Sequence, residues 1–256
     1  MTKIIMKRFP LKPYVLPLLS LSCLASPGVR AADISLGVSG MASVSAYKAK
    51  HTDYMALPSF SYDNDIWYID GAEAGYYVLN DDTNELKLKT FYDDKSYDAD
   101  DGHGAMMRSL NDRHATLMAG ASYQYTLPFG AVRTQVAADV LNNSKGVTAN
   151  FAYLNMLTCG AFTVVPELGV DWANAQQNRY YYGISSEEAR RANIATYRPG
   201  SAFTPYLSLT LDYQLTAHWE TYASARVDWL PSSVRNSPMI DRSETYAYGV
   251  GVKYNF

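Results

Sequence analysis

The sequence predicts an all-β protein: a transmembrane antiparallel β-barrel of 10 to 12 strands, with 12 favoured. Three observations lead to this fold class, namely long segments of alternating apolar and polar residues, connections that are short and long in turn, and an N-terminal export signal. Successive strand side chains point to opposite faces, so alternation gives each segment one apolar and one polar face. A tilted strand of about 9 to 11 residues crosses a bilayer.

The last segment, residues 245–256, shows the alternation most clearly. Its even positions are all valine or aromatic, and its odd positions are small or polar. An edge strand of a soluble sandwich keeps such a pattern for about five or six residues, so the length of this segment favours a barrel. The segment resembles the closing strand of bacterial outer-membrane barrels, whose terminal aromatic residues are read by the assembly machinery. This resemblance makes Tyr254 and Phe256 the predicted assembly signal.

Ten further segments carry the alternation, less clearly toward the N-terminus. They are residues 219–229, 203–213, 162–172, 147–157, 132–140, 115–125, 86–92, 66–79, 56–62 and 34–46. The total of eleven is odd, whereas a barrel with both ends in the periplasm needs an even number. A break at Gly71 would split residues 66–79 and give 12 strands, and merging the first weak pair would give 10.

The connections alternate in length. Residues 127–130, 158–160 and 215–217 are short, whereas residues 93–112, 173–200 and 231–244 are long and polar. The apolar rows on both sides of residue 216 are odd-numbered, so the loop between them holds an odd number of residues, most simply Leu215-Thr216-Ala217. Outer-membrane barrels place short turns in the periplasm and long loops outside the cell. Residues 142–146 would form a tight extracellular turn.

The N-terminus predicts export. Residues 1–31 place basic residues ahead of an apolar run at residues 14–25, which is too short to span a membrane, and end at Val29-Arg30-Ala31. This is the pattern of a cleaved signal peptide, so the expected domains are residues 1–31 and a barrel at residues 32–256. A lipoprotein signal at Cys23 is the less favoured alternative. The expected location is the outer membrane of a Gram-negative cell, in contact with its lipid.

Removal of the leader changes the charge and cysteine content. It takes away five of the 22 Lys and Arg residues and none of the 25 Asp and Glu residues, leaving a formal net charge of −8. This charge argues against nucleic acid as a partner. Only Cys159 remains, so an intrachain disulfide is excluded.

The sequence predicts no enzyme, no cofactor and no metal site. His114 with Thr116 is the nearest approach to a catalytic pair. A structural role, as a hydrogen-bonded histidine inside the barrel, is favoured over a catalytic one. Asp98, Asp100 and Asp101 with Gly102 resemble part of a calcium loop but lack its remaining spacing and closing glutamate, so a solvated acidic loop is favoured.

Two sets of residues are candidates for a function. Eight residues share the polar face of their strands and are predicted to face the lumen: Arg133, Asp139, Tyr206, Asp212, Glu220, Tyr222, Arg226 and Asp228. They either fill and brace a narrow interior, which is favoured, or line a selective pore. Three aromatic residues on a long outer loop, Tyr180, Tyr181 and Tyr182, are predicted to serve extracellular recognition.

Four blocks resemble the MipA/OmpV family of outer-membrane proteins. They are residues 110–123 (LNDRHATLMAGASY), 138–146 (ADVLNNSKG), 180–209 (beginning YYYGIS) and 237–246 (SPMIDRSETY). The resemblance implies a non-enzymatic scaffold that links a lytic transglycosylase to a bifunctional penicillin-binding protein in peptidoglycan synthesis. Other relatives imply a small-solute porin or antibiotic-uptake channel, or a surface adhesin. Asn142 and Lys145 depart from the family pattern, and the oligomeric state stays open.

Overall fold

A computed structural model describes residues 32–49 and 52–256, so the leader predicted at residues 1–31 lies outside the described residues. Its strands form one antiparallel sheet that closes on itself through pairing of β10 with β11. In chain order they are β1 (Asp33–Val44), β2 (Thr52–Asp63), β3 (Trp67–Asp70), β4 (Glu73–Asn80), β5 (Asn84–Asp93), β6 (Thr116–Leu127), β7 (Gly130–Asp139), β8 (Val147–Leu154), β9 (Leu157–Cys159), β10 (Phe162–Ala173), β11 (Ala202–Gln214), β12 (Trp219–Trp229) and β13 (Glu244–Asn255). The predicted barrel is confirmed.

The predicted count of 12 strands is also confirmed. β8 and β9 both pair with β10 and are two parts of one interrupted strand, so the wall has 12 strands. The expected break lies at Gly71, between β3 and β4, where φ is +55°. Glycine adopts this left-handed conformation without the steric penalty that a Cβ atom brings. β3 and β4 are short, which explains why residues 66–79 alternate weakly as one segment.

Apolar side chains cover the outside of the wall. The exposed large apolar residues include Val136, Leu168, Phe203 and Val250, each on the parity predicted for its strand. In an outer-membrane barrel this outer surface faces the lipid, so these apolar side chains contact acyl chains and need not be buried in a protein core. The closing strand, β13, pairs with β12 on one side and with β1 on the other.

The turn between β11 and β12 corrects one detail. Its loop has an odd number of residues, as predicted, but the backbone N–H of Leu215 donates to Trp219 O at 2.8 Å, so Leu215 belongs to the ladder. The loop is therefore residues 216–218, one position later than expected. The hydroxyl of Thr216 accepts hydrogen bonds from the backbone N–H groups of His218 and Trp219, which fixes this shorter turn.

β2 is an edge strand along most of its length. β3 pairs only with residues 61–63 of β2, so within residues 52–60 the described strands supply β1 as the single ladder partner. The backbone N–H of Gly71 donates to Phe60 O, which shows that even positions of β2 direct their backbone groups away from β1. Pro58 stands at such an even position. Its missing N–H therefore removes no bond to β1, which is where proline is tolerated in a sheet.

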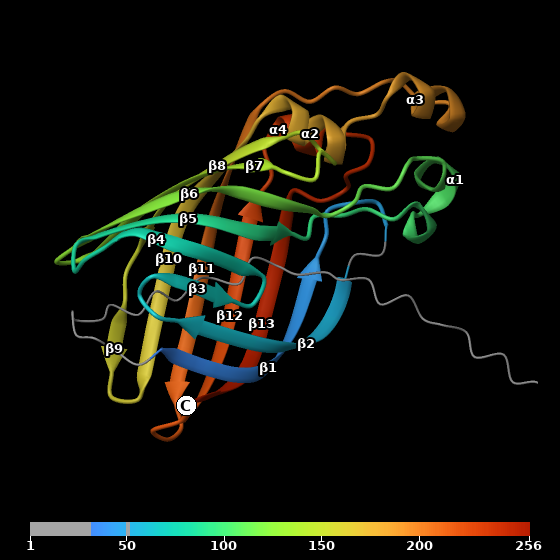
Figure 1. The fold of residues 1–256 in the computed structure, drawn as a ribbon. Helices are drawn as coiled ribbons and strands as arrows, with labels where there is room; N and C mark the ends of the chain where they lie inside the picture. Colours follow the sequence, from blue (N-terminus) through green and yellow to red (C-terminus); the bar gives the residue numbers. More distant parts are fainter. Residues whose placement is uncertain (1–31, 50–51) are drawn as a thin grey trace, which may run out of the picture.

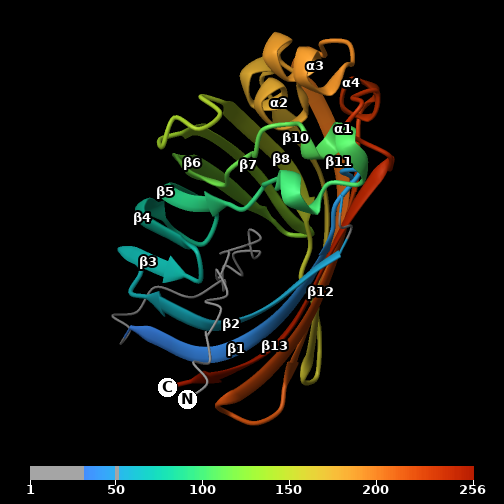
Figure 2. The same cartoon turned by 90° about the vertical axis from the view of Figure 1, so that its right-hand side faces the viewer.

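The long loops gather at one end of the barrel. Figures 1 and 2 show four short helices there, at the end opposite the C-terminus: α1 (Gly104–Arg108), α2 (Ala175–Tyr182), α3 (Ser186–Ala192) and α4 (Ser232–Arg235). The short turns lie at the other end, as predicted. Among the described residues no helix has the length and apolar character needed to cross a membrane.

Candidate functional site

A chain of polar contacts runs along the inner wall of the barrel from β7 to β11. The guanidinium of Arg133 on β7 lies 2.7 Å from the carboxylate of Glu167 on β10. The hydroxyl of Tyr206 on β11 donates to the same carboxylate at 2.5 Å and accepts from Asn150 Nδ2 on β8 at 3.0 Å. Buried charges are tolerated only when they are paired and hydrogen-bonded in this way.

The chain continues to β12. Asn150 Nδ2 also donates to Asp171 on β10 at 2.7 Å, and the other oxygen of Asp171 accepts from Arg226 at 2.5 Å. Arg226 donates twice to Asp228 as well, and its guanidinium carbon stands 3.6 Å from the centre of the Tyr206 ring. This cation–π contact adds to the ion pairs. The contacts bridge five neighbouring strands, β7, β8, β10, β11 and β12.

A second interior cluster lies on the opposite arc of the wall. Lys89 on β5 pairs with Glu73 on β4 at 2.8 Å. The ammonium of Lys87 lies 4.8 Å from the ring centre of Tyr68 and 4.9 Å from that of Tyr77. The short strands β3 and β4 are thus held to β5 by side chains as well as by backbone bonds.

Two cavities in the described part of the chain lie beside these clusters. The larger, about 410 Å³, lies beneath the outer loops and is lined by Glu73, Lys89, Arg133, Tyr206 and Arg226 among others. The smaller, about 150 Å³, is lined by polar and apolar side chains of β1, β2, β3, β11, β12 and β13. Both reach Arg226, which therefore stands between them.

The eight residues predicted to face the lumen divide into groups. Arg133, Tyr206, Arg226 and Asp228 line the larger cavity. Asp212, Tyr222 and Arg226 line the smaller one. Glu220 pairs with Lys253 at 2.9 Å, between neighbouring strands β12 and β13.

Asp139 has a local task at the outer rim. Its carboxylate accepts from the hydroxyl of Thr116 at 2.5 Å and from the backbone N–H groups of Ser144 and Lys145. The turn that follows needs positive φ at Asn142 and Lys145, 61° and 53°. These hydrogen bonds compensate for that backbone strain, so Asp139 shapes the predicted tight turn at residues 142–146.

Sequence reasoning missed two central members of the network, Glu167 and Asp171. Both stand at odd positions of β10, whose even positions were predicted to face outward, so the parity rule already placed them inside. Glu73 and Lys89 were missed for another reason, because β4 and β5 lie where the alternation is weak.

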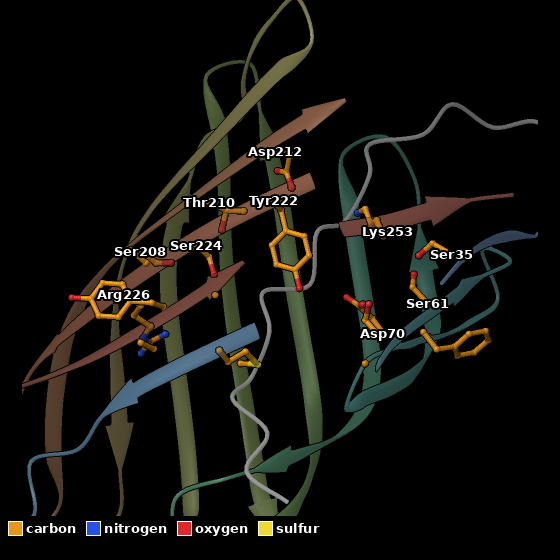
Figure 3. Close-up of a pocket in the computed structure, with 18 residues that line it drawn as sticks. Ser35, Ser61, Asp70, Ser208, Thr210, Asp212, Tyr222, Ser224, Arg226 and Lys253 are labelled. Carbon is orange, nitrogen blue, oxygen red and sulfur yellow. The ribbon is translucent and has the colours of Figure 1, made fainter. Parts of the chain in front are cut away.

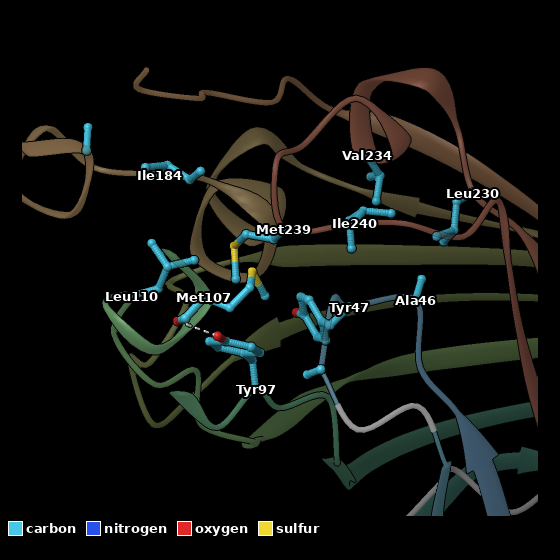
Figure 4. Packing of buried hydrophobic residues seen from close by; sticks show 12 residues of the cluster. Ala46, Tyr47, Tyr97, Met107, Leu110, Ile184, Leu230, Val234, Met239 and Ile240 are labelled. Atoms are coloured by element: carbon cyan, nitrogen blue, oxygen red, sulfur yellow. Dashed lines mark hydrogen bonds between the residues drawn. The ribbon is translucent and has the colours of Figure 1, made fainter. Parts of the chain in front are cut away.

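The outer loops fold into a cap with its own apolar core. Twelve buried residues form this cluster, among them Tyr47, Met107, Ile184 and Met239, which come from four separate loops (Figure 4). The cap forms the roof of the larger cavity, since Tyr47, Leu230 and Ile240 also line it. Burial raises the pKa of the Tyr47 phenol well above its usual value.

A buried ion pair locks the cap. Arg113 lies 2.7 Å from Glu188, with side-chain exposures of 6% and 3%. The same carboxylate accepts backbone N–H groups of Asn111 and Ser185, the latter as half of a capping box at the start of α3. Burial raises the pKa of Glu188, but these hydrogen bonds and the Arg113 charge outweigh it, so the pKa lies below the usual range.

The three consecutive tyrosines belong to the cap. Tyr181 is 0% exposed. Its hydroxyl donates to His114 O at 3.1 Å, and its carbonyl accepts from the hydroxyl of Tyr47 at 3.0 Å. Tyr180 accepts from the backbone N–H of His114, and Tyr182 packs against the apolar cluster. These rings fill the space between the outer loops. The Tyr181 ring is therefore buried in the cap and does not lie on the surface where recognition was predicted.

The predicted assembly residues lie at the opposite end. Phe256 is exposed, and its ring makes an edge contact with that of Tyr254, 4.9 Å between centres. Tyr254 also contacts Trp219 at 5.1 Å. A small aromatic cluster thus ends the closing strand.

Comparison with known proteins now decides the family. The family described as "MltA-interacting protein MipA" matches residues 36–256. The chain belongs to the MipA family. Within it, this MipA-family barrel is 37% identical over 210 residues to the MltA-interacting protein of Escherichia coli K12, covering 82% of this chain and 85% of that protein. It is 33% identical over 226 residues to the putative outer membrane protein YiaT of the same organism, covering 88% and 92%.

Solved structures similar to the MipA-family barrel are themselves outer-membrane barrels. The NanC porin covers 86% of this chain and 100% of its own, at 10% identity and a TM-score of 0.44. An outer membrane channel of Pseudomonas putida F1 covers 91% and 100%, at 12% identity and a TM-score of 0.45. The relatives carry names of interacting or outer-membrane proteins, and the outer membrane is the location of this chain.

Proposed function

We propose that this protein is a non-enzymatic scaffold that holds a lytic transglycosylase, and with it a bifunctional penicillin-binding protein, at the inner face of the outer membrane. The observation that carries the proposal is the 37% identity, over 82% of the chain, to a relative named for its interaction with MltA. The braced interior and the capped mouth support it, because a rigid closed barrel suits a tether better than a wide channel.

The surface that a periplasmic partner reaches is small and acidic. The described short turns, residues 64–66, 81–83, 128–129, 160–161 and 216–218, contain three aspartates and neither lysine nor arginine. Complementary charge raises association rates and sets orientation more than it raises affinity. A partner that docks here is therefore expected to present a basic patch.

The test is capture of a purified lytic transglycosylase by the protein in detergent. Asp82 is exposed on a periplasmic turn, and Asp100 is exposed on an outer loop, so Asp82→Lys and Asp100→Lys make a matched pair. We expect Asp82→Lys to weaken capture at low salt and Asp100→Lys to leave it unchanged. If the intact protein retains neither a transglycosylase nor a penicillin-binding protein, the scaffold proposal fails.

A second candidate is a small-solute porin or antibiotic-uptake channel. The observation in its favour is that two interior cavities meet at Arg226. Planar-bilayer recordings decide it: stepwise conductance that changes in Arg226→Ala supports a pore, and silence of both proteins removes it. An adhesin role stays a prediction; deletion of residues 177–198 tests it, with unchanged surface attachment as the result against it.

A further inference from the structure

Three consecutive inward positions of β11 carry side chains with unused hydrogen-bonding capacity. Ser208, Thr210 and Asp212 are 2%, 6% and 7% exposed. Within the described residues Ser208 Oγ, Thr210 Oγ1 and Asp212 Oδ2 have no hydrogen-bond partner. Buried polar side chains are nearly always paired with protein or with ordered water. At about 3.3 Å per residue the row is roughly 13 Å long, so a single water molecule cannot pair with all three side chains.

The row faces the smaller cavity, about 150 Å³ (Figure 3). On the other walls the cavity is lined by further hydroxyl groups and one carboxylate, those of Ser35, Ser61, Tyr222, Ser224 and Asp70. An apolar cavity of about this volume accommodates a six-membered ring such as benzene. This cavity therefore has room for one ring of that size, and its lining combines these polar groups with apolar side chains such as those of Met41, Phe60 and Tyr248.

Two glycines make the room. A Cβ atom at position 251 would lie 2.5 Å from the Tyr222 ring, and one at position 249 would lie 2.7 Å from Ser224 Oγ. Gly251 of β13 thus lets the Tyr222 ring lie against the wall, and Gly249 leaves room for the Ser224 hydroxyl. A flat ring beside hydroxyl groups offers both an apolar surface and polar contacts to a ligand.

The charges of the cavity decide which ligand fits. Its two cations are already engaged, Arg226 by Asp171 and Asp228, and Lys253 by Glu220. The groups left over are hydroxyl and carboxylate oxygens. Such groups bind a ligand that donates hydrogen bonds more tightly than they bind an anion. We propose that this cavity binds a small uncharged polyhydroxylated solute of monosaccharide size, with Ser208, Thr210 and Asp212 as its principal contacts.

The experiment uses the whole protein in detergent micelles and isothermal titration calorimetry. The probes are glucose and N-acetylglucosamine, with gluconate and inorganic phosphate as anionic comparisons. We expect saturable millimolar binding of at least one sugar and none of either anion. Thr210→Val and Asp212→Asn should each weaken that binding about tenfold, since each removes or alters a hydrogen bond made in a buried site.

Thr134→Val is the matched control, because Thr134 is exposed on the outer face of β7. It should bind as the unaltered protein does. Folding of each variant is judged by migration of the unheated protein on a gel. If Thr210→Val or Asp212→Asn fails to fold, Ser208→Ala, the smallest change in the row, still tests the proposal.

Three outcomes would overturn the proposal. No saturable binding of either sugar means that water alone satisfies the row. Binding that all of Thr210→Val, Asp212→Asn and Ser208→Ala leave intact places the sugar elsewhere. Preference for gluconate or phosphate contradicts the charge argument. None of these outcomes bears on transglycosylase capture, so the scaffold proposal is judged separately.

Discussion

The Arg113–Glu188 pair gives the sharpest test of how the cap is held. Glu188→Gln keeps the size of the side chain and one of its two acceptor oxygens but removes its charge. Arg113 then stays buried opposite a neutral amide, and the amide nitrogen cannot accept the backbone N–H that an oxygen of Glu188 accepts from Asn111 or Ser185. Breaking a buried pair by removing one partner costs about 3 to 5 kcal/mol. The lower figure applies here because other acceptors of Arg113 persist, the carbonyls of Asn111 and Gly183.

A loss of about 3 kcal/mol should make opening of the cap roughly a hundredfold more frequent, since 1.4 kcal/mol corresponds to a factor of ten. Amide hydrogen exchange measures this opening directly when the barrel itself stays folded. We expect the amides of α3 to lose about two orders of magnitude of protection in Glu188→Gln. The amides of β10 to β13 should keep theirs.

Glu187→Gln is the matched control, because Glu187 is exposed on the same turn of α3. It removes one negative charge from the same helix and should leave protection unchanged. The pH dependence gives a second readout. Because the folded-state pKa of Glu188 is depressed, its stabilising contribution is present above its unfolded pKa and is lost as the pH falls through the folded value. If α3 is equally protected in both variants, or if the unaltered cap resists acid as Glu188→Gln does, the ion pair does not hold the cap.

Three further predictions follow from the interior and the cap. Tyr206→Phe should lower the urea midpoint of unfolding in vesicles by an amount equivalent to about 1 to 3 kcal/mol, because Glu167 and Asn150 lose a shared hydrogen-bond partner. Tyr213→Phe is its control, because Tyr213 stands at an outward-facing position of the same strand. Gly169→Ala should destabilise the barrel, since its Cβ would lie 2.5 Å from the Tyr206 ring, whereas Gly40→Ala meets nothing closer than 3.8 Å and should be neutral in the same assay. Burial, with the charge of Asp93, raises the pKa of Asp94 to about 8. The cap should therefore lose stability as the pH rises toward 8, and Asp94→Asn should abolish that loss; protection factors of the cap amides that stay constant across this range are the contrary result.

The sequence was informative wherever one face of a strand meets lipid. The segments from residue 115 onward alternate over nine or more positions, and β10 to β13 begin and end within one or two residues of the prediction. Upstream, β3 has four residues and β4 has eight. Such short strands show too few alternations to be separated by periodicity, so Gly71 and the parity of the count were the better signals.

The contacts inside the barrel could not be predicted from the same pattern. Parity shows that a side chain points inward, but its partner depends on the stagger between strands. Arg133 and Glu167 are 34 positions apart, and Arg226 and Asp171 are 55 apart. The cap was missed for a similar reason: Met107, Ile184 and Met239 stand singly in polar loops without helical or strand periodicity, and only the folded loops bring them together.

The interior network and the cap have one physical cause in common. A 12-stranded barrel encloses more space than side chains of the wall alone fill, unlike a barrel of about eight strands. Two features reduce this space: paired charges link strands along the inner wall, and the outer loops fold inward over the larger cavity. Among the described residues each feature still leaves a buried polar atom unpaired, Glu167 Oε2 in the network and Arg113 Nε in the cap, and the row on β11 is the largest such group. A bound solute would therefore form the most new hydrogen bonds by replacing water at that row. This binding does not depend on which protein docks at the periplasmic turns.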